Sequence, residues 1–96
     1  MNKEELVRKL RSYLPGRIEF KKHADKRSLD RDVSDEKVME MLSSSTALLD
    51  FQEQVDRYPN RRKFRLIYEL NKRDRLFIVV SLNDILEVMT IWPRWR

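Results

Sequence analysis

The chain contains no cysteine, a single glycine, a single histidine and only three prolines. Without cysteine it has no disulfide framework and no thiolate metal site, and one histidine is too few for a typical zinc site. It lacks a glycine-rich phosphate loop and any apolar run near the ~20 residues of a membrane span. The first residues also lack the basic-then-apolar order of a signal peptide. These absences predict a cytoplasmic protein without a cofactor, a metal or membrane contact.

Charged side chains are abundant and unevenly distributed. They make up 39% of the 96 residues, and apolar residues make up 41%, which suits one domain (residues 1–96) with a modest core. Residues 1–56 carry a net charge of −1, whereas residues 57–96 carry +6. Such a basic half is typical of nucleic-acid-binding proteins, although it also suits a patch that meets an acidic protein. The scarcity of glycine beside many Arg, Lys and Glu residues is a mild thermophile signature.

Apolar spacing and capping residues predict helices in the first half of the chain. Asn2 and Glu5 form a capping pair ahead of an apolar stripe, and Pro15 with Gly16 ends that helix. Ser34 is a suitable cap for a later helix, whose first turn is acidic. We therefore expect helices at residues 2–14, 23–31 and 34–42, with a short strand at residues 17–20.

The second half of the chain has the alternation of β-strands. We expect strands at residues 46–55, 64–70, 76–80 and 85–92, with a two-residue turn at Asn83-Asp84 and an end to pairing at Pro93. In the first of them, the apolar side chains of Ala47, Leu49, Phe51 and Val55 are expected on one face. The strand at 76–80 is apolar throughout, which predicts a central position. The fold class is therefore α+β, with helices packed on one face of a four-stranded antiparallel meander.

One segment combines the only histidine with two arginines at helical spacing. His23, Arg27 and Arg31 are four residues apart, so a helix would place them on one face. An imidazole titrates near neutral pH and is a candidate general base for a ribose 2′-hydroxyl, while a guanidinium stabilises the charged phosphate. Equally, His23 could hydrogen-bond a backbone group at a junction of strand and helix. The arginines could instead pair with nearby aspartates.

Two basic stretches are candidates for contact with nucleic acid. The first contains Arg61, Arg62, Lys63 and Arg65, of which Lys63 and Arg65 are expected on the same face of a strand. They could contact phosphates or form a solvated edge that discourages aggregation. Tyr68 is expected on the opposite face, in the core.

The second stretch is the basic-aromatic end of the chain, which contains Trp92, Arg94, Trp95 and Arg96. Indoles beside arginines suit base stacking and phosphate contact. They equally suit the anchoring of the tail to its own fold or to a partner protein.

The order His23-Ala24-x-x-Arg27-x-x-x-Arg31-x-Val33-Ser34 resembles a small prokaryotic domain family that is grouped with the RelE/ParE/BrnT-like toxins. The last strand, Leu86-Glu87-Val88-Met89-Thr90-Ile91-Trp92, is also similar to that family. The resemblance covers residues 18–92, and the helix at 2–14 looks like an addition to it. Many ribonuclease members have a C-terminal Tyr or His, where this chain has Trp92-Pro93-Arg94-Trp95-Arg96.

The resemblance implies a RelE-like fold and two alternative functions. The first is a toxin-type, metal-independent endoribonuclease, with RNA as its partner, usually on the ribosome, and a protein antitoxin. Its catalytic residues would be His23, Arg27 and Arg65. The residues that would contact RNA are Arg61, Arg62, Lys63, Arg94, Trp95 and Arg96. The alternative is a non-catalytic module of the same fold that binds nucleic acid or a protein, since fold alone does not determine activity. Homodimerisation stays open.

Overall fold

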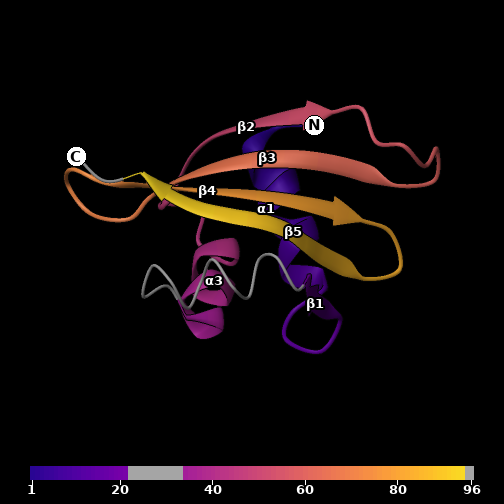
Figure 1. The fold of residues 1–96 in the computed structure, drawn as a ribbon, viewed down its shortest axis with the longest axis horizontal. Helices are drawn as coiled ribbons and strands as arrows, with labels where there is room; N and C mark the ends of the chain where they lie inside the picture. The colour runs from indigo at the N-terminus through magenta and orange to yellow at the C-terminus, as the bar shows by residue number, and fades with distance from the viewer. Residues whose placement is uncertain (22–33, 95–96) are drawn as a thin grey trace.

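The computed structural model of this chain describes residues 1–21 and 34–94 (Figure 1). Over those ranges the elements are α1 (Lys3–Ser12), β1 (Ile18–Phe20), α3 (Asp35–Leu42), β2 (Leu48–Gln54), β3 (Arg62–Glu69), β4 (Arg75–Leu82) and β5 (Leu86–Arg94). The expected α+β class is confirmed. The helix expected at residues 23–31 lies outside the described residues. Neither α1 nor α3 has the length and apolar character of a membrane-spanning helix.

The five strands form one mixed sheet in the spatial order β1-β5-β4-β3-β2. Strands β2 to β5 pair antiparallel with their neighbours in chain order, as the expected meander does. The sheet nevertheless has five strands instead of four, because β1, expected as a separate short strand, pairs parallel with β5. The N–H of Leu86 donates to the Arg17 carbonyl, and the N–H of Lys21 donates to the Val88 carbonyl. Local patterns predicted β1 but could not indicate a partner so distant along the chain.

Strand β4 is the middle strand of the sheet, as its apolar sequence predicts. Leu76, Ile78 and Val80 are fully buried on the face that carries the helices, and Val79 is buried on the other face. Both helices contribute to the same core. The core contains Leu6 and Leu10 of α1 and Val38 and Leu42 of α3. They pack with buried residues of the strands: Phe64, Leu66, Tyr68, Leu76, Ile78, Val80, Leu86, Val88 and Ile91. We call the opposite face of the sheet the distal face.

The helix starts follow the capping residues of the sequence. The Asn2 side chain accepts the N–H of Glu5 at 2.9 Å, while the Glu5 carboxylate accepts the N–H of Asn2. The Ser34 hydroxyl accepts the N–H of Lys37 at 3.1 Å and begins α3. Near the end of α1, the Tyr13 hydroxyl donates to the Asn83 carbonyl at 2.6 Å. This bond ties α1 to the connection between β4 and β5.

Strand β2 departs from the expected alternation. A bulge between Leu48 and Asp50 adds one residue, so Leu48 is buried while Leu49 is 44% exposed and Val55 is 95% exposed. The prediction that Leu49 shares a face with Phe51 is therefore wrong, because the extra residue reverses the order of the two faces. Val55 is exposed because it lies beyond the end of β2 at Gln54.

The end and the start of β5 also differ from expectation. The connection from β4 spans residues 83–85 rather than two residues, since Leu82 pairs with Leu86. Pro93 does not end the pairing, because it lies opposite Leu76. Strand β1 pairs with β5 only as far as Val88, so near Pro93 one side of β5 has no partner strand in the described sheet. Proline lacks an N–H donor and is tolerated along such an edge.

Candidate functional site

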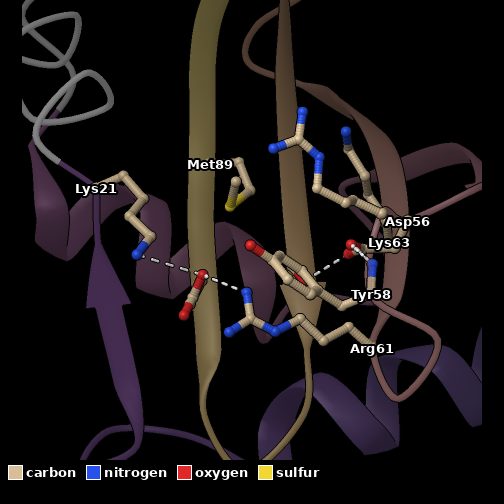
Figure 2. A pocket seen from close by; sticks show the side chains of 9 residues that line it. Lys21, Asp56, Tyr58, Arg61, Lys63 and Met89 are labelled. Carbon is tan, nitrogen blue, oxygen red and sulfur yellow. Dashed lines mark hydrogen bonds and ion pairs between the residues drawn. The ribbon is translucent and has the colours of Figure 1, made fainter.

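A polar cavity of about 440 Å³ lies between the β2–β3 connection and the distal face of the sheet (Figure 2). Its lining comes from the end of β1, from the connection and from β3, β4 and β5: Lys21, Asp56, Arg57, Tyr58, Arg61, Lys63, Ser81, Glu87 and Met89. Four of these side chains are cationic and two are carboxylates, a formal excess of two positive charges. We call this feature the corner cavity. Its charge favours anions.

Asp56 holds the β2–β3 connection onto the sheet. Its carboxylate accepts the Ser81 hydroxyl of β4 at 2.9 Å and the N–H of Tyr58 at 3.0 Å. The backbone bond from Tyr58, reinforced by the Ser81 bond and by nearby Arg61, lowers the pKa of Asp56 below its ordinary value. The N–H of Arg61 donates to the Tyr58 carbonyl and closes the turn at Pro59-Asn60. These bonds hold the start of the connection against the distal face.

Glu87 joins three separate segments of the chain at the floor of the cavity. This residue lies on β5 and is only 8% exposed. Its carboxylate is 3.4 Å from the Lys21 ammonium and 3.4 Å from the Arg61 guanidinium. Figure 2 shows the two cations reaching this carboxylate from opposite sides. The Lys21 ammonium also lies 3.9 Å from the Glu19 carboxylate. An ammonium has three N–H donors and a guanidinium has five, so these carboxylates leave donors for a further anion.

An aromatic ring stands beside the cations. The Arg61 guanidinium lies 4.8 Å from the centre of the Tyr58 ring, which is within cation–π range. Tyr58 is 50% exposed, so this ring and its arginine form one rim of the cavity. A planar group that entered the cavity could stack on either of them.

Farther along the distal face lies a pair of aromatic rings. Phe77 of β4 and Trp92 of β5 are directly opposite in the register, with ring centres 5.2 Å apart and planes tilted by 37°. Both are half-buried, as is Ile67, which is the β3 neighbour of Phe77. Phe77 and Ser81 are four residues apart on one strand, so about 13 Å separates this pair from the corner cavity. A short oligonucleotide could span both features.

The structure divides the basic run of β3 between the two faces of the sheet. Arg61 and Lys63 line the corner cavity, and Arg65 lies on the same face, as expected for Lys63 and Arg65. The Arg65 guanidinium donates to the Gln52 side chain at 3.1 Å, and its Nε atom is buried with no hydrogen-bond partner in the described part of the chain.

Arg62 points away from the distal face. Its guanidinium donates to both carboxylate oxygens of Glu53, at 2.7 and 2.9 Å, and lies over the Phe64 ring. These charge-assisted bonds lower the pKa of Glu53 and raise that of Arg62. The structure therefore does not bring Arg62 together with Arg61, Lys63 and Arg65.

The other predicted site residues fall outside this geometry. His23, Arg27, Arg31, Trp95 and Arg96 lie outside the described residues. Arg94 ends β5, where it is opposite Arg75 in the register. Across residues 1–21 and 34–94, no three His, Cys, Asp or Glu side chains come together in a way that would hold a metal ion.

Sequence reasoning missed several residues of the site. Glu87 stands between two apolar residues of a strand, a pattern that indicates its face but not its partners. Lys21 and Phe77 carried no local signal for a site, because only the fold places them on the same face as Lys63. Tyr58 lies between Arg57 and Arg61 in the sequence, and an aromatic residue among cations is the signal that could have indicated it.

No protein family model, no curated protein and no solved structure matches this chain. The resemblance to the RelE/ParE/BrnT-like toxins therefore stays a prediction from the sequence.

Proposed function

We propose that the distal face of this chain binds single-stranded RNA. The observation that carries the proposal is that one sheet face has both a half-buried aromatic pair, Phe77 with Trp92, and a cation-lined cavity. Proteins that bind single strands combine aromatic rings, on which bases stack, with a basic groove for the phosphates. The choice of RNA over DNA rests on the sequence resemblance described above.

Each part of the face has a role in this proposal. Bases stack on the accessible parts of the half-buried Phe77 and Trp92 rings, which a duplex with paired and stacked bases could not use. Lys63, Arg57 and Arg61 contact phosphates at the corner cavity. Because the phosphate contacts dominate, binding should be salt-dependent and largely independent of base sequence.

Two adjacent cations on opposite faces provide the test. Lys63→Ala should weaken binding of a labelled oligoribonucleotide and reduce the slope of log K against log salt by about 0.7, the value for one phosphate contact on a single strand. Arg62→Ala removes the same charge one residue away, but Arg62 is turned towards Glu53. It should therefore leave the slope unchanged. Fluorescence anisotropy at several salt concentrations measures both slopes.

The two variants must differ for the proposal to hold. Equal losses in both would mean that only net charge matters, and an effect of Arg62 alone would move the contact surface to the other face of the sheet. Circular dichroism confirms that each variant is folded before the slopes are compared.

Cleavage of the bound RNA is a further prediction of the RelE-like resemblance. His23 would transfer the proton of a ribose 2′-hydroxyl, while Arg27 and Arg65 would stabilise charge on the phosphate. Incubation with RNA and EDTA should then produce 2′,3′-cyclic phosphate ends. His23→Gln, which cannot titrate near neutral pH, should abolish them but retain RNA binding. A folded Gln variant with full cleavage would remove His23 from the mechanism, and intact RNA with the native chain would leave a binding module.

A further inference from the structure

The corner cavity is lined by cations, whereas the aromatic pair offers uncharged rings, so the two features suit different parts of a bound RNA strand. We infer that the corner cavity binds the terminal phosphate of an RNA strand, a phosphomonoester, rather than a phosphate within the chain. The inference rests on the proposed function, because the strand beyond that phosphate would extend towards Phe77 and Trp92.

The charge of the cavity matches a terminal phosphate. A phosphomonoester carries about −1.5 to −2 charges at neutral pH, as in phosphorylated side chains, whereas an internal phosphodiester carries one. The lining has a formal excess of two positive charges. A terminal phosphate therefore neutralises this excess more completely than an internal one.

The arrangement of the cations also favours a strand end. Lys21 follows β1, Arg57 and Arg61 come from the β2–β3 connection, and Lys63 lies on β3. Cations from three segments thus surround one volume, and Figure 2 shows Lys21 and Arg61 converging from opposite sides. A terminal phosphate has one ester link and can be contacted from several sides, whereas an internal phosphate needs two exits for the chain.

Glu87 and Asp56 hold the cavity in this form before a ligand binds. Glu87 keeps Lys21 and Arg61 near one another, although their charges repel, and Asp56 holds the connection onto Ser81. Donors positioned in this way lose less conformational entropy when an anion arrives. The volume, about 440 Å³, is in the range of small-molecule sites and admits the terminal nucleotide with its phosphate.

The test compares oligoribonucleotides of one sequence with a 5′-phosphate, a 3′-phosphate or neither, at fixed salt. One phosphorylated form should bind at least about tenfold more tightly than the form without a terminal phosphate, the effect of one hydrogen-bonded charged group. Inorganic phosphate should compete with that form more strongly than with the unphosphorylated one. Which end gives the effect identifies the polarity of the bound strand.

A matched pair of variants locates the effect. Arg57→Gln removes one cavity cation but leaves the bonds of Asp56 and Glu87 in place, and it should reduce the preference for the phosphorylated form to less than about threefold. Arg73→Gln makes the same change in the exposed β3–β4 connection, at the opposite end of the sheet, and should retain the full preference.

The outcomes separate this inference from the proposed function. If all three oligoribonucleotides bind equally, RNA binding stands and the terminal-phosphate site is overturned. If none binds, the proposed function fails and the inference fails with it. A preference that Arg57→Gln and Arg73→Gln reduce equally would place the site outside the corner cavity and overturn the inference.

Discussion

Replacing Phe77 or Trp92 by leucine is expected to lower the affinity for single-stranded RNA by about 5- to 150-fold, since stacking of one base on an aromatic ring contributes about 1–3 kcal/mol. The two rings lie 5.2 Å apart on the distal face, and leucine keeps apolar bulk there but offers no flat surface to a base. The slope of affinity against salt should not change, because no phosphate contact is lost.

Phe51 provides the control for this experiment. It lies opposite Leu66 in the register, is half-buried and packs against the core, so it belongs to the other side of the sheet. Phe51→Leu should therefore leave RNA affinity unchanged while altering stability to a similar extent. Anisotropy measures binding, and urea denaturation shows that each variant is folded. Loss of affinity in Phe51→Leu, or full affinity in both distal-face variants, would contradict stacking on this pair.

The elements that sequence patterns predicted well are those with a local cause. Phe64, Leu66 and Tyr68 alternate with neighbours that are charged except at Ile67, and all three are buried on the helix-covered face. Asn2 and Ser34 cap the helices that follow them. In each case the signal and the structure depend on residues within a few positions of one another.

The errors in the predicted fold concern contacts or irregularities that local patterns do not contain. The bulge after Leu48 reverses which residues of β2 are buried, and nothing in an alternating pattern marks an inserted residue. The parallel pairing of Ile18 with Leu86 joins distant parts of the chain. The sequence predicted a strand there, but tertiary contacts determine where it pairs.

In the candidate site too, local patterns predicted which face a residue lies on but not which distant residues it meets. Alternation predicted that Lys63 and Arg65 share a face, as the register shows. Arg62 was grouped with them from its position in the basic run, but its bonds to Glu53 hold it on the other face. The charge asymmetry favoured residues 57–96 alone, yet Lys21 from the first half of the chain lines the cavity. Glu87, the group to which Lys21 and Arg61 are both paired, appears in the sequence as an isolated acid. Composition therefore indicated a basic surface but not the cavity within it.

Replacing Leu10 by alanine is expected to destabilise the chain by about 2–5 kcal/mol, the range for deletion of a fully buried leucine side chain. Leu10 lies on α1, which the family resemblance leaves outside residues 18–92. It is nevertheless completely buried, in the same core as Leu66 and Ile78. A marginally stable domain of this size would lose a large part of its stability. Urea denaturation of the full chain measures the change.

Leu49→Ala is the matched control, because the same side chain is removed where it is 44% exposed at the bulge of β2. It should cost much less, within about 1 kcal/mol, since little apolar surface returns to water. If Leu10→Ala proved as mild as Leu49→Ala, α1 would be an appendage with little influence on the sheet. A large loss makes α1 a structural part of the domain: its burial, together with the Tyr13 bond to Asn83, then supports the connection into β5, the strand that carries Glu87 and Trp92.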